Sequence, residues 1–82
     1  MRYKFSTFSG SEYMIDDTAG TWKRRNVQPG HEDILGYDKD AGTLDEFPDI
    51  YIGERAFLYT DGTCIRTTPV MRIELLDFNE EN

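Results

Sequence analysis

The sequence predicts an all-β fold, a small antiparallel barrel or roll of five to six strands. Apolar and polar residues alternate along several short stretches, which is the period-two pattern of half-buried strands. Tight turns separate these stretches, and Asp61-Gly62 is the clearest of them. The glycines in the long middle of the chain leave no 3.6-residue apolar stripe, so a helix is not expected there.

Residues 1–27 are expected to form a meander of three antiparallel strands. The alternation runs through residues 3–7, resumes over residues 12–16 and returns over residues 21–27. Gly10, at the centre of a Ser-Gly-Ser connection, suits a hairpin loop with one residue at positive φ, and residues 17–20 form the second turn. The apolar side chains that anchor these strands are Tyr3, Phe5, Tyr13, Ile15 and Trp22.

Residues 28–49 interrupt the alternation and are predicted to form a long acidic loop. Prolines and glycines punctuate this stretch, and most residues between them are acidic. Short strand pieces near residues 34–35 or 43–47 would shorten the loop. Loops longer than about 12 to 15 residues are uncommon in compact domains and tend to be functional or mobile.

Strand character returns in residues 50–59, where Gly53 marks a candidate bulge or point of close approach. Asp61-Gly62 fits a two-residue type I′ turn, which requires positive φ at both central positions. Residues 64–68 are then expected to pair back across this turn.

A final strand is expected over residues 70–78, followed by a frayed tail at residues 79–82. Pro69 cannot donate a hydrogen bond to a strand ladder, so it marks an edge, a bulge or a corner before that strand. Six strands joined by tight turns predict a barrel of the SH3-like or a similar type, which closes on itself to limit exposed edges.

Length and composition indicate one globular domain in a reducing compartment. The 82 residues leave no room for two domains. Cys64 is the only cysteine, so no intrachain disulfide can form and the cytoplasm is the expected setting. The first residues lack the apolar stretch of a signal peptide, and no run approaches the ~18 apolar residues of a membrane span, so no membrane contact is expected.

The charge of the chain is concentrated in its middle. Residues 28–54 hold eight acidic residues against the single base Lys39, a local net charge of −7 that equals the net charge of the whole chain. Residues 1–27 carry a net charge of +2, and residues 55–82 carry −2. Such an uneven field concerns the surface and its partners and does not determine the fold.

A calcium site is the first chemistry that this acidic stretch suggests. Asp38, Asp40 and Asp49 stand near the positions that a twelve-residue calcium loop would use. However, Gly42 comes one place too early for the sharp turn, Thr43 occupies the glycine position, and neither flank has a helical pattern. A solvated acidic loop is the favoured interpretation, and no metal is expected.

A basic cluster next to an aromatic ring is the second candidate. Residues 23–25 read Lys-Arg-Arg and follow Trp22. In a strand, alternation sends Lys23 and Arg25 to one face and Trp22 with Arg24 to the other, so no continuous basic stripe forms. Because the chain also carries a net charge of −7, direct nucleic-acid binding is not expected.

A dyad of His31 and Cys64 is the third candidate. His31 lies beside two acidic residues and is most simply a surface imidazole, whereas Cys64 begins a predicted strand, where a small semi-buried residue is ordinary. The chain contains no nucleophile elbow, phosphate-binding loop, dinucleotide fingerprint or cysteine and histidine pair at zinc spacing. The sequence therefore predicts neither an enzyme nor a cofactor.

A partial pattern links the chain to other small proteins. Residues 7–16 read Thr-Phe-Ser-Gly-Ser-Glu-Tyr-Met-Ile-Asp, Thr-Trp-Lys-Arg follows at residues 21–24, and Thr-Thr-Pro-Val lies at residues 67–70. Over about a third of its length the chain resembles small uncharacterised proteins of bacteriophages and actinobacteria. The resemblance implies a small accessory phage-type protein, placed in the host cytoplasm, and transfers no activity or functional residue.

These observations predict a non-enzymatic protein-binding module, accessory or host-modulating, that contacts a basic partner through residues 32–54. Aromatic anchors among the charges would supply the binding energy. The residues predicted to bind the partner are Asp38, Asp40, Asp45, Glu46, Asp49, Tyr37, Phe47 and Tyr51. The alternatives are an assembly subunit that self-associates through an edge strand and an acidic mimic of nucleic acid.

Overall fold

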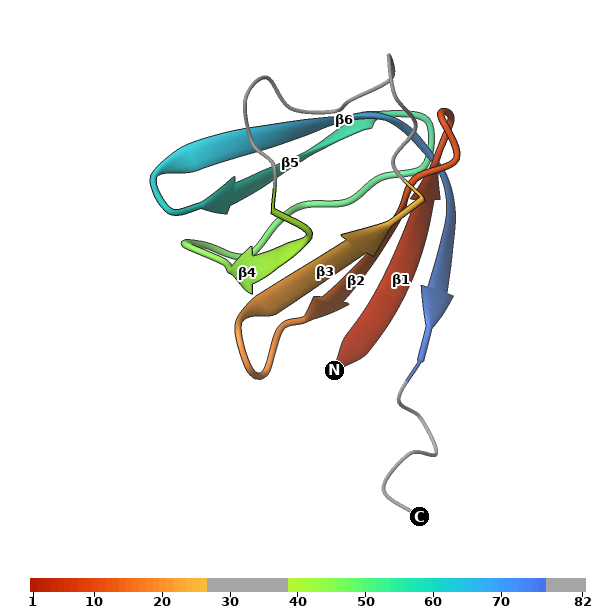
Figure 1. Cartoon of the computed structure of the whole chain (residues 1–82). Coiled ribbons are helices and arrows are strands. Elements are labelled where there is room, and N and C mark those ends of the chain that lie inside the picture. Colours follow the sequence, from red (N-terminus) through yellow and green to blue (C-terminus); the bar gives the residue numbers. More distant parts are fainter. Residues whose placement is uncertain (27–38, 77–82) are drawn as a thin grey trace.

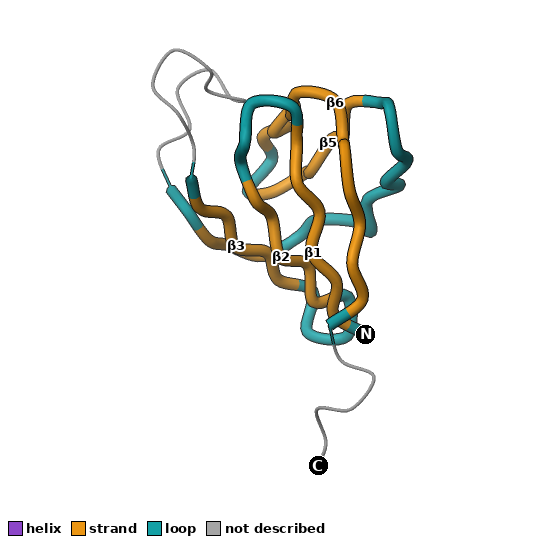
Figure 2. The backbone as a smooth tube through the Cα atoms, turned by 90° about the vertical axis from the view of Figure 1, so that its right-hand side faces the viewer, coloured by secondary structure: helices purple, strands orange, loops and turns teal. Residues whose placement is uncertain are grey.

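The computed structural model describes residues 1–26 and 39–76, which form six β-strands and no helix (Figure 1). The strands are β1 (Arg2–Thr7), β2 (Glu12–Asp16), β3 (Thr21–Arg25), β4 (Ala41–Thr43), β5 (Arg55–Thr60) and β6 (Thr63–Leu75). They pair in the order β4-β3-β2-β1-β6-β5, each neighbour antiparallel, and the sheet curls into a nearly closed barrel (Figures 1 and 2). The predicted all-β barrel is thus confirmed.

The turns adopt the backbone conformations that their residues predict. Gly10 has a φ of 93° in the hairpin between β1 and β2. Asp61 and Gly62 have φ values of 53° and 71°, so both central positions of the turn between β5 and β6 are positive, as the type I′ prediction requires. These turns set the registers that place Tyr13 opposite Phe5 and Cys64 opposite Tyr59.

The last two predicted strands are one strand in the structure. Residues 64–68 and 70–78 were expected to be separate, but β6 runs from Thr63 through Pro69 to Leu75. The strand bends where it changes partner, because the register shifts beside Pro69 in the pairing with β5 and beside Val70 in the pairing with β1 (Figure 1). Pro69 therefore sits at an irregularity, where a missing N–H is tolerated.

Two other predicted boundaries need correction. The stretch that was expected to be loop over residues 28–49 contains β4, and the predicted strand over residues 50–59 becomes regular only at Arg55. Ile52 forms an isolated parallel bridge with Val70 ahead of that strand. The first 11 residues of the predicted loop, Val27 and the predicted tail at residues 79–82 lie outside the described residues.

The core fills the concave side of the sheet with alternate residues from five of the strands. The ring centroids of Phe5 and Tyr13 lie 5.0 Å apart with an interplanar angle of 9°, a stack worth about 0.5–1.5 kcal/mol beyond burial alone. The buried apolar side chains are Phe5, Tyr13, Ile15, Trp22, Ala56, Leu58, Ile65 and Val70. None of the described residues belongs to a helix that could cross a membrane.

One buried hydrogen bond joins β3 to the end strand β5 across the barrel. The indole Nε1 of Trp22 on β3 donates to Oγ1 of Thr60 on β5 over 3.1 Å. Gly42 on β4 lies against this bond, because a Cβ at that position would be 3.0 Å from the indole nitrogen and 3.2 Å from the threonine oxygen. Glycine is needed here because the backbone of β4 approaches these two side chains closely. β4 can therefore cover the seam of the barrel, which is the gap between the end strands β4 and β5.

Candidate functional site

Residues 39–45, which we call the closing segment, fasten the seam of the barrel. The backbone N–H of Asp45 donates to the carbonyl of Tyr59 on β5 over 2.7 Å, and the N–H of Leu44 donates to Gly20 in the turn before β3 over 2.8 Å. The carboxylate of Asp45 accepts a 2.8 Å hydrogen bond from the N–H of Gly62. The side chain of Asp45 therefore holds the tip of the β5–β6 hairpin.

Asp40 also bonds within the molecule. Nε of Arg24 lies 3.4 Å from the Asp40 carboxylate, and the N–H of Arg24 donates to the Asp40 carbonyl over 2.8 Å. The Arg24 side chain is only 5% exposed, and its guanidinium carbon lies 5.9 Å from the ring centroid of Trp22. Asp40 thus neutralises a largely buried cation, which is a structural role.

Residues 46–52, which we call the displayed segment, turn large apolar side chains toward solvent. Phe47 is 72% exposed, Tyr51 is 59% exposed and Ile52 is 58% exposed. Ile50, between them, packs against the core cluster. The segment is therefore fixed to the barrel through one side chain and presents three others outward.

Backbone hydrogen bonds fix the far end of the displayed segment. The N–H of Gly53 donates to the Val70 carbonyl over 2.7 Å, and the Val70 N–H donates to the Glu54 carbonyl over 2.9 Å. Gly53 was predicted to be a bulge or a point of close approach, but no side chain or backbone atom lies within 4 Å of where its Cβ would be. Its φ of 89° instead makes it a turn residue beside the bridge of Ile52, a conformation that favours glycine. The exposed rings consequently stand on a backbone held at both ends.

The two carboxylates of the displayed segment are exposed, and their fields act on two tyrosines. Burial raises the pKa of Tyr3, and the charges of Asp17 and Asp49 raise it further. The pKa of Tyr59 is raised first by the charge of Cys64 and by a hydrogen bond with its thiol, and least by Glu46.

The structure divides the predicted partner-binding residues into three groups. Asp40 and Asp45 are bonded to the barrel, whereas Glu46, Phe47, Asp49 and Tyr51 are gathered on the displayed segment. Tyr37 and Asp38 lie outside the described residues. The sequence analysis did not include Ile52 in the site, because period-two alternation puts it on the same side as Ile50, which packs against the core, whereas Ile52 is 58% exposed.

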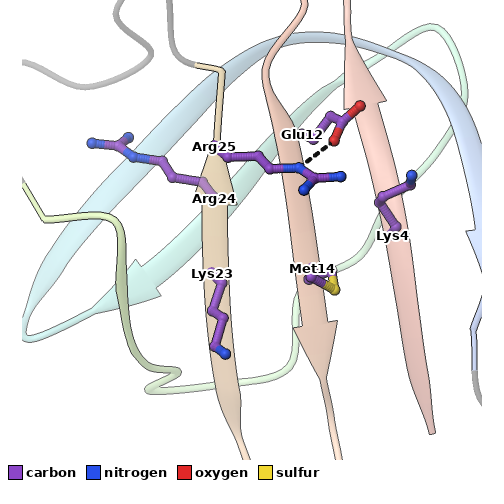
Figure 3. Close-up of a pocket in the computed structure, with 6 residues that line it drawn as sticks. All are labelled: Lys4, Glu12, Met14, Lys23, Arg24 and Arg25. Carbon is purple, nitrogen blue, oxygen red and sulfur yellow. Dashed lines mark hydrogen bonds and ion pairs between the residues drawn. The ribbon is translucent and has the colours of Figure 1, made fainter.

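The convex face of β1, β2 and β3 is a second surface with a distinct composition. Register places Met14 directly between Lys4 on β1 and Lys23 on β3, on the side away from the core. A hollow of about 130 Å³ opens among these three side chains and Arg25 (Figure 3). Figure 3 shows Arg25 reaching across to Glu12, whose carboxylate lies 2.7 Å from Nε of Arg25, while Arg24 points away from the others.

This arrangement confirms the predicted split of the basic cluster. Lys23 and Arg25 are exposed, and Trp22 and Arg24 are buried on the opposite side of β3. The hydrogen bond from Arg25 lowers the pKa of Glu12 below its ordinary value, and the charges of Arg25 and Lys4 act in the same direction. Among the described residues, no carboxylate lies within ion-pair distance of Lys23.

The other sites suggested by the sequence gain no support. Cys64 is exposed and not semi-buried as predicted, because register puts it opposite Tyr59 on the convex side of the hairpin. His31 lies outside the described residues. Within residues 1–26 and 39–76, no three or more histidine, cysteine or acidic side chains converge as metal ligands would.

Comparison with known proteins gives no relative. No known family, curated protein or solved structure matches the chain. The resemblance to small phage and actinobacterial proteins therefore stays a prediction, and the case for a function depends on the two surfaces described above.

Proposed function

We propose that the protein is a non-enzymatic protein-binding module that holds a basic partner through the displayed segment. The observation that carries this proposal is the exposure of Phe47 and Tyr51, 72% and 59%, on a backbone that is hydrogen bonded at both ends. We further propose that it is a small accessory or host-modulating phage-type protein that acts in the cytoplasm.

The aromatic rings of the displayed segment are the proposed source of the binding energy. Binding energy in protein interfaces comes mostly from a few large side chains, and aromatic residues are prominent among them. Because the displayed segment is already fixed by Ile50 and by the bonds at Gly53, little backbone entropy would be lost when a partner covers Phe47 and Tyr51. The energy of covering the rings would then be available for binding.

The carboxylates around these rings favour a partner with a cationic surface. Glu46 and Asp49 flank Phe47 on both sides, and Glu54 follows two residues after Ile52. Carboxylates at the rim of an interface contribute little energy but raise the association rate with a cationic surface. Lysine or arginine side chains of the partner can also stack on Phe47 and Tyr51.

Photo-crosslinking tests the proposal directly. A photoreactive phenylalanine analogue is placed at Phe47 in one preparation and at Phe8 in another, and both are illuminated in an extract of the organism that encodes the chain. Phe8 is a matched control, because it is 75% exposed but lies in the β1–β2 hairpin. We expect one defined protein with a basic surface to be captured at position 47 and not at position 8, and we expect added salt to reduce the yield of the crosslinked product.

Equal capture at the two positions, or no capture at position 47, would contradict the proposal. Capture through a partner surface that carries no excess of lysine and arginine would contradict the proposed charge complementarity. If the captured protein binds DNA and is released by DNA, the acidic mimic of nucleic acid becomes the better description.

A further inference from the structure

The row of Lys4, Met14 and Lys23 combines an apolar centre with two cationic flanks. Lys4 is ion-paired with Glu74 on β6 over 3.4 Å and its side chain is 25% exposed, whereas Lys23 is exposed and has no carboxylate of the described residues within ion-pair distance. Adjacent strands lie about 4.8 Å apart, so the two lysines are separated by about 10 Å across Met14. Met14 is 39% exposed, although it stands in the middle strand of the three. We call this row, together with Arg25 above it, the basic face.

The basic face extends beyond one hollow. A second hollow of about 260 Å³ adjoins the first and shares Met14 and Lys23 with it, with Arg2 and Thr21 on its far side. The outward side chains of β1, β2 and β3 include four bases and two acids, a net charge of +2 in a protein whose net charge is −7. This surface therefore selects an anionic partner with an apolar group for Met14.

The chain itself displays a segment with that chemistry. Glu46 and Asp49 give the displayed segment a charge of −2, opposite in sign to that of the basic face, and Phe47 and Tyr51 supply rings. Methionine sulfur packs favourably at the edges of aromatic rings, and lysine ammonium groups bind to their faces. Charge and side-chain chemistry are thus complementary between the two surfaces.

The fold prevents the two surfaces from meeting within one molecule. Lys4, Met14 and Lys23 project from the convex side of the sheet, whereas Ile50 packs on the core side. The chain between β4 and β5 passes behind β3, β2 and β1 when the basic face is viewed from the front (Figures 1 and 3). A contact between the surfaces must therefore join two molecules.

We propose that the displayed segment of one copy binds the basic face of a second copy, so that the protein self-associates head to tail. This proposal rests on the proposed function, because the same segment makes the contact, and it identifies a further copy as one basic partner. The contact is heterologous, since each copy contributes a different surface, and it leaves one face and one segment of every pair unfilled. Growth is limited by the repulsion between copies of net charge −7.

Complementation between two defective variants tests the proposal. The face-loss variant carries Met14→Gln and Lys23→Gln, and the segment-loss variant carries Phe47→Ser and Tyr51→Ser. All preparations carry Cys64→Ser, because the exposed thiol would otherwise allow disulfide-linked dimers. The weight-average mass is measured by sedimentation equilibrium over a series of concentrations at about 0.15 M ionic strength, where the Debye length is about 8 Å.

The parent protein, in which both surfaces are intact, should have a weight-average mass that rises above 9.5 kDa with concentration. Each defective variant alone should stay at the monomer mass. An equimolar mixture should form a pair and grow no further, because only one intact face and one intact segment remain. Labelled segment-loss variant should show amide shift changes at Lys4, Met14 and Lys23 when unlabelled face-loss variant is added.

Two matched controls make the result specific. Arg66→Gln removes one exposed base from the outside of β6, so its net charge of −8 equals that of the face-loss variant. Phe8→Ser removes an exposed ring outside the displayed segment. Both controls should associate like the parent protein, and loss of association in either one would overturn the proposal.

A monomer mass for the parent protein at every concentration would also overturn the proposal, as would a mixture that fails to pair. Either result leaves the proposed function intact, because capture of a different basic protein at position 47 does not depend on self-association. Capture at position 47 of a second copy of this chain alone would support self-association, whereas capture of no protein there would contradict both proposals.

Discussion

The closing segment and the displayed segment are neighbours in one acidic stretch, yet they do different things. In residues 39–45, Asp40 and Asp45 bond to Arg24 and to the β5–β6 hairpin. In residues 46–52, Glu46 and Asp49 are exposed beside exposed aromatic rings. The difference teaches that a run of like charge is not one functional unit. Part of it bonds to an arginine and to the backbone of its own molecule, whereas none of the described residues forms an ion pair with Glu46 or Asp49.

Enlarging Gly42 should give the largest loss of stability. In Gly42→Val the new side chain meets the Trp22 indole nitrogen at 3.0 Å and the Thr60 oxygen at 3.2 Å, so it disturbs the hydrogen bond of the seam. Overpacking of this kind costs about 1–3 kcal/mol. Urea unfolding, followed by the fluorescence of Trp22, measures the change.

Ala41→Val is the matched control, because Ala41 is the preceding residue of β4 and is exposed. We expect its free energy of unfolding to stay within about 0.5 kcal/mol of the parent value. Equal effects of the two substitutions would show that β4 does not close the barrel.

Substituting two adjacent acidic residues should distinguish the closing segment from the displayed segment. Asp45→Ala loses the acceptor of the Gly62 N–H and should reduce the free energy of unfolding by about 0.5–1.5 kcal/mol, as for a typical hydrogen bond. Glu46→Ala, one residue further on, should change it by less than about 0.5 kcal/mol. If Glu46→Ala proved the more destabilising of the two, the assignment of a structural role to Asp45 would be wrong.

Changes in the pKa values of Tyr3 and Tyr59 should be the smallest of the predicted effects, and each change reports on one carboxylate of the displayed segment. Asp49→Asn should lower the pKa of Tyr3 toward its ordinary value of 10.0, although burial and Asp17 will still hold it above that value. Glu46→Gln should instead lower the pKa of Tyr59. Nuclear magnetic resonance titration of the tyrosine rings follows both groups, and an exchange of the two effects would contradict the path of the displayed segment.

The raised pKa of Tyr3 also predicts a pH dependence of stability. The phenol proton of Tyr3 is bound more tightly in the folded state than in the unfolded state. Its contribution to the free energy of unfolding is therefore fully present below about pH 10 and is lost as the pH rises through the folded-state pKa. Because Asp49→Asn lowers the folded-state pKa of Tyr3, it should narrow the alkaline pH range over which the free energy of unfolding falls.

The sequence predicts local conformation well where short-range geometry decides it. Gly10 and Asp61-Gly62 specify turns whose φ values follow from their residue types, and the alternation around Phe5 and Trp22 identifies the core. Pro69 correctly signals an irregularity. The sequence does not reveal that β6 continues through Pro69, because continuity depends on the partners that the strand finds on each side.

The candidate site is predicted only in part, for a similar reason. Charge and aromatic content locate the stretch that contains Phe47 and Tyr51, but the separation of Asp45 from Glu46 depends on the hairpin tip at Gly62, which is 17 residues further along the chain. The row of Lys4, Met14 and Lys23 depends on the register of three strands. Pattern analysis of one strand at a time assigns Lys23 to an outer face and does not find its neighbours.

The account depends most on the claim that Phe47 and Tyr51 serve binding and not folding. The affinity of the Phe47→Ala, Tyr51→Ala variant for the protein captured at position 47 tests it, with urea unfolding measured on the same samples and Phe8→Ala as control. We predict an affinity loss of about 2 kcal/mol or more, roughly 30-fold, with stability within about 0.5 kcal/mol of the parent. Unchanged affinity, or a loss of affinity that Phe8→Ala reproduces, would contradict the account.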